Sequence, residues 1–136
     1  TVADFERLDA RFRLPSDTWL KALPQYKDFG FAVFKLKSGH RKVHPMAFDF
    51  PRRNPQMLFF PTVHIHDGQV HETADFDHKL YLQATGTRRP LAGWRESTRP
   101  PAAFMKIDKT KGIVDPQAHV YRRELHGKLK NVDVVL

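Results

Sequence analysis

The dipeptide Asp67-Gly68 is the feature that most restricts how this chain folds. Asp-Gly between two runs of alternating apolar and polar residues is typical of a two-residue β-hairpin turn, whose central residues need positive φ. Residues 62–66 and 69–72 provide such runs. We therefore expect an antiparallel hairpin over residues 62–72, in which a β-branched side chain in place of Gly68 disrupts the turn.

The register of this hairpin places three histidines on one face. If residue 66 pairs with residue 69, then His64 lies opposite His71, and the period of two puts His66 on the same face. Cross-strand neighbours lie about 5 Å apart, and same-strand i, i+2 positions roughly 6 to 7 Å. The three imidazoles are therefore predicted to lie close enough to converge on one ion.

Neutral imidazole is a ligand for zinc, copper, nickel and iron(II), and three protein ligands leave a coordination position open, as catalytic sites do. The chain contains no cysteine, so only histidine and carboxylate side chains would supply the ligands. The predicted metal ligands are His64, His66, His71 and His78. Asp67 and Glu72 are predicted as alternative ligands or as partners that orient the imidazoles. An open site would support metal-assisted hydrolysis or oxygen chemistry, and the sequence does not select between them.

Basic residues are absent from residues 54–78, the part of the chain that contains these histidines. No Lys or Arg occurs between Arg53 and Lys79, although the chain carries 23 of them in 136 residues, and four acidic residues fall in the same interval. A locally acidic, histidine-rich stretch in a basic chain suits a cation. Two other interpretations stay open: the histidines form an ordinary solvated face of a half-buried sheet, or they exchange protons without a metal.

The net charge of +8 is spread along the chain, with +3 in residues 1–51, +2 in residues 52–104 and +3 in residues 105–136. Residues 85–101 are a loop by composition, in which a tryptophan among arginines would either stack a base or a sugar ring or pin the loop to the core. The candidate polyanion-binding residues are Arg88, Arg89, Trp94 and Arg95. A basic surface that only confers solubility is the alternative interpretation.

The chain length fits a single domain over residues 1–136. Hydrophobic alternation predicts strands at residues 30–37, 43–50, 57–60, 77–84, 102–107 and 132–136. Helices are predicted from the Ser16-Asp17 N-cap to the proline at position 24, with Trp19 in the core, and over residues 116–126, although the pair Val120-Tyr121 favours a strand there. We expect an α+β domain dominated by an antiparallel sheet, as an open barrel or a small sandwich, with one or two short helices.

No motif in the chain selects a reaction. There is no phosphate-binding glycine loop, nucleophile elbow or zinc-protease helix. No apolar run approaches membrane-spanning length and no signal-peptide pattern opens the sequence, so we expect a soluble protein whose compartment is open. Three functions follow as hypotheses: a metal-binding domain with catalysis open, a basic nucleic-acid-interacting module or metal-free nuclease, and a structural or interaction domain without chemistry.

Overall fold

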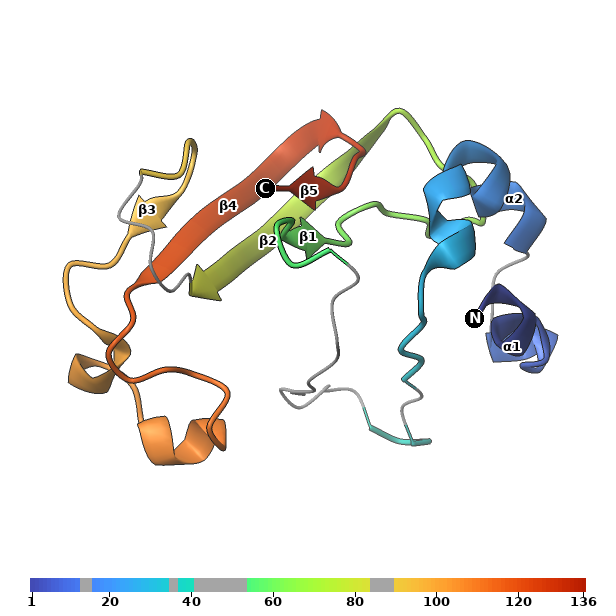
Figure 1. The fold of residues 1–136 in the computed structure, drawn as a ribbon. Helices are drawn as coiled ribbons and strands as arrows, with labels where there is room; N and C mark the ends of the chain where they lie inside the picture. The colour runs from blue at the N-terminus through green and yellow to red at the C-terminus, as the bar shows by residue number, and fades with distance from the viewer. Residues whose placement is uncertain (13–15, 35–36, 41–53, 84–89) are drawn as a thin grey trace. The chain divides into compact units, whose positions relative to one another are not determined.

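The computed structural model describes residues 1–12, 16–34, 37–40, 54–83 and 90–136. These residues form two antiparallel sheets with a few short helices (Figure 1), which confirms the predicted α+β class. They divide into two compact units, the first formed by residues 1–74 and 130–136 and the second by residues 75–129. A single domain over the whole chain stays a prediction, as does the choice between barrel and sandwich.

The first unit begins with short helices. They are α1 (Val2–Glu6), η1 (Ala10–Phe12), α2 (Ser16–Ala22) and η2 (Pro24–Asp28), the two η elements being 3₁₀ turns. Thr1 caps α1, because its Oγ1 accepts a hydrogen bond from the Asp4 amide at 3.2 Å. Pro24 lacks an amide proton and ends the α-helical ladder of α2. The helix predicted after Ser16 is therefore confirmed.

An aromatic cluster forms the core of this unit around Trp19, which is only 4% exposed. The Trp19 ring lies 5.9 Å from Phe5, 5.6 Å from Phe31 and 6.2 Å from Tyr26, measured between ring centroids. The cluster continues with Tyr26 stacked on Phe29, which in turn meets Phe59 of the first strand edge to face. Each such edge or stacked contact stabilises the fold by about 0.5–1.5 kcal/mol beyond burial of area. The predicted role of Trp19 as a core residue is confirmed.

The sheet of the first unit pairs β1 (Phe59–Phe60) with β5 (Val134–Val135) in antiparallel register, Phe59 opposite Val135. Leu58 and Leu136 exchange two amide–carbonyl hydrogen bonds of 2.9 Å beyond the strand ends. The strand predicted at residues 57–60 is therefore observed in its last two residues, and the strand predicted at 132–136 is observed at residues 134–135.

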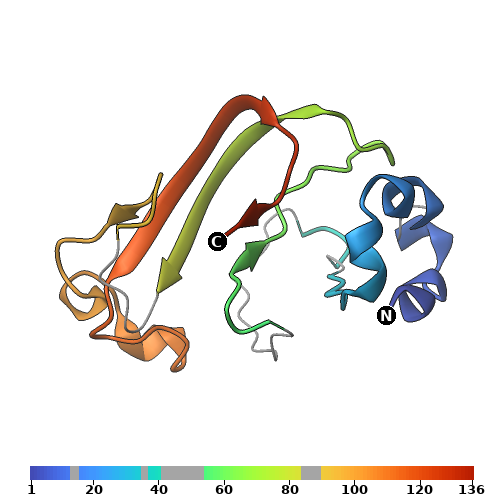
Figure 2. The same ribbon diagram turned by 45° about the horizontal axis from the view of Figure 1, so that its top comes forward.

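The second unit contains most of a three-stranded sheet in the order β2-β4-β3. Its strands are β2 (Thr73–Gln83), β3 (Arg95–Glu96) and β4 (Val120–Lys130). Figures 1 and 2 show β2 and β4 running side by side in opposite directions and curving together. Phe76 and Leu82 of β2 and Tyr121 and Leu125 of β4 are buried, as the period of two requires for the covered face of a half-exposed sheet.

The helix predicted over residues 116–126 is wrong, because most of that range belongs to β4. Asp115 still caps the start of this segment, because its Oδ1 accepts hydrogen bonds from the amides of Gln117 at 2.8 Å and Ala118 at 3.3 Å. The Gln83 side chain then binds the backbone of the same turn, donating to the carbonyls of Asp115 and Ala118 and accepting from the Asp115 amide. These bonds hold the turn beside the end of β2, and the chain leaves it as a paired strand.

The strand predicted at residues 102–107 is also wrong. Two 3₁₀ turns, η3 (Pro101–Ala103) and η4 (Ile107–Thr110), occupy this region. Two adjacent prolines cannot donate to a ladder, and the carbonyl of Pro101 instead accepts from the amides of Phe104 and Met105. A tight turn follows η4, with Gly112 at a φ of +82°.

In the first unit, the strand predicted at 30–37 is not observed in residues 30–34 and 37, which belong to neither a helix nor a strand. The strand predicted at 43–50 lies outside the described residues. Within the described ranges, none of the helices is long and apolar enough to cross a membrane.

Candidate functional site

Asn131 fixes the two ends of the loop that carries the predicted ligands, residues 64–71, which we call the histidine loop. The Asn131 side chain is buried, at 5% exposure. Its Nδ2 donates to the carbonyls of His64 and His71, both at 3.0 Å, and its Oδ1 accepts from the His64 amide at 2.8 Å. Because one nitrogen binds both carbonyls, their oxygens lie no more than about 6 Å apart. The amide side chain thus closes the histidine loop at its base.

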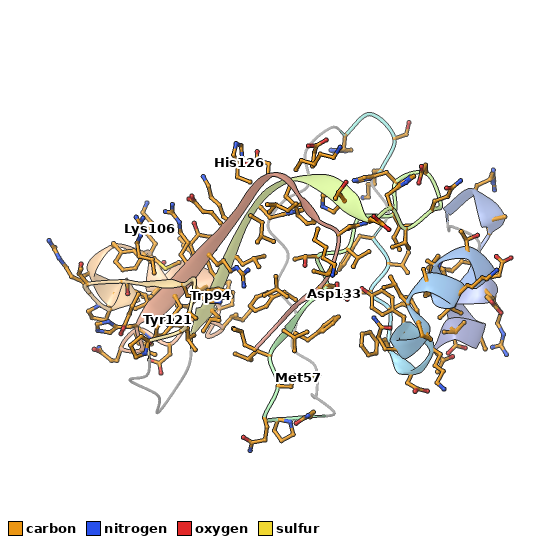
Figure 3. All side chains as sticks on the ribbon, turned by 90° about the horizontal axis from the view of Figure 1, so that it is seen from above. Met57, Trp94, Lys106, Tyr121, His126 and Asp133 are labelled. Atoms are coloured by element: carbon orange, nitrogen blue, oxygen red, sulfur yellow. The ribbon has the colours of Figure 1, made fainter. Side chains whose placement is uncertain are left out.

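Asp133 anchors the chain just before this loop. Its Oδ1 accepts hydrogen bonds from the amides of Thr62 at 2.9 Å and Val63 at 3.2 Å, and its Oδ2 accepts from the Tyr26 hydroxyl at 2.5 Å. The Thr62 hydroxyl in turn donates to the carbonyl of Val132 and accepts from the Val134 amide. Asp133 lies in the short segment between β4 and β5 (Figure 3). Residues 131–134 therefore position the histidine loop from its N-terminal side.

The turn inside the loop differs from the expected hairpin. Gly68 has a φ of +81°, as predicted, but residues 62–72 form no paired strands and residues 66–69 are a bend. Asp67 Oδ1 accepts from the Gln69 amide at 3.0 Å, an Asx-type turn that replaces the backbone turn of a two-residue hairpin. The predicted hairpin ladder is therefore wrong. The side chain of Asn131 stands where the ladder bonds between residues 64 and 71 were expected.

The three histidines of the loop belong to two separate pairs, one of two histidines and one of a histidine with an aspartate. The rings of His64 and His66 lie 5.0 Å apart between centroids, with their planes at 67°. His71 Nε2 lies 2.7 Å from Asp67 Oδ2, and both of these side chains are more than half exposed. Among the described residues, no three His, Asp or Glu side chains are grouped closely enough to hold a metal ion. The structure thus brings His64 and His66 together and places His71 with Asp67.

Two ionisable groups near the loop have shifted pKa values. The hydrogen bond from His71, helped by the amide of Gln69, lowers the pKa of the Asp67 carboxyl below its ordinary value. Burial, helped by the Asp133 carboxylate, raises the pKa of the Tyr26 hydroxyl above its ordinary value. Asp67 is therefore ionised and Tyr26 is protonated at neutral pH.

The remaining predicted ligands, His78 and Glu72, are not members of these two pairs. His78 is on β2 in the second unit, where its ring lies 5.6 Å from that of Phe76. Glu72 has an exposed side chain, and its backbone carbonyl accepts a hydrogen bond of 2.8 Å from the Asn131 amide. Their roles as ligands stay predictions.

Of the predicted polyanion-binding residues, Arg88 and Arg89 lie outside the described residues. Trp94 is half-buried and its indole nitrogen is shielded from solvent. Arg95 is exposed on β3, opposite Arg122 of β4. In Figure 3, Trp94 and Tyr121 lie on one side of the sheet and His126 on the other, in agreement with the alternation along β4.

Sequence reasoning missed both Asn131 and Asp133. The available signal is the alternation of Asn131, Val132, Asp133 and Val134, which puts two polar side chains on one face of a strand otherwise rich in valine. A second missed group is Glu96 with His119 and Tyr121. His119 Nδ1 lies 3.2 Å from Glu96 Oε1.

Glu96 lies directly opposite Tyr121 in the strand pairing, and burial together with this carboxylate raises the pKa of the Tyr121 hydroxyl. More than twenty residues separate Glu96 from His119 and Tyr121, so no local pattern reveals this group.

Comparisons of the chain with protein-family models, with curated proteins and with solved structures find no match.

Proposed function

We propose that the histidine loop binds a divalent transition metal ion such as zinc, copper, nickel or iron(II). The observation that carries the proposal is the 5.0 Å separation of the His64 and His66 rings. Two imidazoles bound to one tetrahedral ion at about 2.0–2.1 Å per nitrogen have ring centres about 5 Å apart. The spacing of these two rings is therefore compatible with a shared ion.

The contact between His71 and Asp67 supports His71 as the third ligand of the ion. Metal-bound histidines commonly direct their second ring nitrogen at a carboxylate, which fixes the ring and increases its basicity. Because Nε2 of His71 faces Asp67 at 2.7 Å, ligation through Nδ1 would preserve this contact. The proposal requires the His71 and Asp67 side chains to turn together toward the other two rings, while the backbone held by Asn131 stays in place.

Calorimetric titration of tag-free protein with zinc, nickel and copper tests the proposal. We expect single replacements of His64, His66 or His71 by Ala to weaken binding at least ten-fold, since each removes a ligand. Asp67→Asn should weaken it by about 10–100-fold, as loss of an orienting carboxylate does. Binding should fall as pH drops below about 6.5, where protons compete with the metal for imidazole.

His126→Ala is the matched control. This histidine lies on β4 with an 82% exposed side chain and pairs with Asp77 at 3.5 Å, outside the histidine loop. Its loss should leave the titration unchanged, and His78→Ala in the same series tests the predicted fourth ligand. If wild type and His71→Ala titrate alike with all three metals, the proposal is wrong, and the loop histidines are a solvated surface.

A further inference from the structure

The second unit contains a pocket beside β3 in which two arginines and an exposed aromatic ring meet. It has a volume of about 330 Å³ and is lined by residues 95–99 together with Ala103 and Phe104. Arg95 and Arg99 are its basic side chains, and the Phe104 side chain is 57% exposed. The pocket shares no residue with the histidine loop, so a ligand bound there is independent of the proposed metal site.

Local bonding fixes the walls of this pocket. The Ser97 hydroxyl donates to the Arg99 carbonyl at 2.8 Å and accepts from the Val120 amide at 3.0 Å, while the Ser97 amide donates to the Val120 carbonyl. The two bonds to Val120 fasten the segment after β3 to the start of β4, and the bond to Arg99 closes a turn within that segment. The backbone of Arg95 and Arg99 is therefore held in place at the pocket by hydrogen bonds.

The aromatic wall is equally well held. Phe104 follows η3, whose Pro101 is fully buried and accepts hydrogen bonds from the amides of Phe104 and Met105. The backbone under the ring is thus anchored although the ring faces solvent. An exposed ring on a fixed backbone loses little entropy when a flat ligand stacks on it.

The charge of the pocket favours an anion. Arg122, opposite Arg95, is paired with Glu124, and the acidic wall residue Glu96 is engaged by His119 and by the Tyr121 hydroxyl. Residues 75–129 as a whole carry 11 Lys or Arg and 6 Asp or Glu, a net charge of +5. Guanidinium groups match the geometry of phosphate oxygens and bind them with paired hydrogen bonds.

We propose that this pocket binds one nucleotide of a single-stranded nucleic acid, with the phosphate held by Arg95 and Arg99 and the base stacked on Phe104. The volume lies at the low end of small-ligand sites, about 300–1,000 Å³, which suits one nucleotide rather than a larger ligand. A positively charged surface combined with a stacking ring is the arrangement that single-strand binding proteins use. An inorganic anion alone would leave the ring without a role.

Fluorescence anisotropy with labelled oligo(dT) and oligo(U) of about 12 nucleotides tests the proposal in the full chain. We expect binding at about 30 mM salt that weakens at about 150 mM, because phosphate contacts release counterions. Replacing both Arg95 and Arg99 by Gln should weaken binding and flatten the log–log salt slope by about 0.7, since the two arginines hold one phosphate and each single-strand phosphate contact contributes about 0.7. Phe104→Ala should weaken binding by roughly 5- to 100-fold, and Phe104→Trp should retain it.

Lys128→Gln is the matched control, because it removes one positive charge from the same unit. Lys128 is exposed on β4 six residues beyond Arg122, a distance of about 20 Å along the strand. This distance exceeds the Debye length of about 10 Å at 0.1 M salt. Circular dichroism of each variant checks that the fold is intact.

Three results would overturn the proposal. The first is no binding of either oligonucleotide by the wild type at low salt. The second is an arginine double variant or Phe104→Ala that binds as well as Lys128→Gln. The third is competition by free mononucleotide, or binding of a duplex, as tight as that of the single strand, which would assign the pocket to a small molecule or to duplex DNA.

Discussion

Removing the Asn131 amide should loosen the base of the histidine loop and lower the stability of the whole protein. Asn131→Ala deletes three hydrogen bonds to the backbones of His64 and His71. Each net contribution is about 0.5–1.5 kcal/mol, which gives about 1.5–4.5 kcal/mol in total. Because His71 is exposed, its carbonyl regains water when the bond is lost. We therefore expect a loss of about 2–3 kcal/mol in the free energy of unfolding.

Urea denaturation measures this loss, and Asn54→Ala is the control. Asn54 is exposed and accepts one hydrogen bond of 3.0 Å from the Gln56 amide within a turn, so its replacement should cost less than about 1 kcal/mol. Hydrogen exchange at the His64 amide should also accelerate in Asn131→Ala, because that amide loses its acceptor. Equal destabilisation by the two asparagine substitutions would refute the role given to Asn131.

Asn131→Asp separates shape from hydrogen bonding, because the two side chains have nearly the same size. The new carboxylate would place an oxygen 3.0 Å from two carbonyl oxygens that now accept hydrogen bonds. Its pKa should therefore be raised in the folded state, since only the protonated form donates. The difference in the free energy of unfolding between this variant and the wild type should be smallest below about pH 4. It should grow as pH rises and the new carboxyl group ionises. A stability difference that does not change with pH would contradict this account.

Further predictions concern the turn and the two shifted groups. Gly68→Val should cost about 1–2 kcal/mol in urea denaturation because of the positive φ, and Gly68→Asn less, since Asn tolerates this conformation. Tyr26→Phe should destabilise by about 1–2 kcal/mol through loss of the bond to Asp133. Because the pKa of Tyr26 is raised, wild-type stability should fall as pH rises above about 10, and this fall should shrink in Tyr26→Phe. His71→Ala should move the pKa of Asp67 back up toward its ordinary value in an NMR titration. In the wild type, the Asp67 carboxylate contributes to the stability of the fold above about pH 4, and this contribution is lost as pH falls through its lowered pKa.

Local patterns in the sequence predicted the elements whose shape is decided locally. The helix after Ser16 ends where Pro24 removes an amide proton, and the alternation in residues 77–83 matches the burial along β2. Positive φ at Gly68 also followed from the dipeptide alone. In each case the deciding interaction lies within a few residues of the pattern.

Two of the errors, the helix at residues 116–126 and the hairpin at residues 62–72, occurred where distant side chains compete with local signals. Asp115 caps a turn as its sequence context predicts, but Gln83 binds that turn from 32 residues away and the chain continues as a strand. Similarly, the Asp67-Gly68 signal produced the turn without the hairpin, because Asn131 takes the hydrogen bonds of residues 64 and 71. Neither competitor is visible in the residues around the motif. The pairing of His64 with His66 agrees with their two-residue spacing, and the separate position of His71 follows from the missing ladder.

The long sequence separation of the loop's anchoring bonds also governs when the loop takes its shape. Asn131 binds residues 60 and 67 positions earlier, and Asp133 binds residues 70 and 71 positions earlier. At a synthesis rate of about 5–20 residues per second, His71 is synthesised about 3–12 s before Asn131. During that interval the segment has the turn at Asp67 but neither of its anchors. An ion that binds during this interval would bind a peptide without its anchoring hydrogen bonds, whereas an ion that binds later would bind a loop whose backbone is already closed by Asn131.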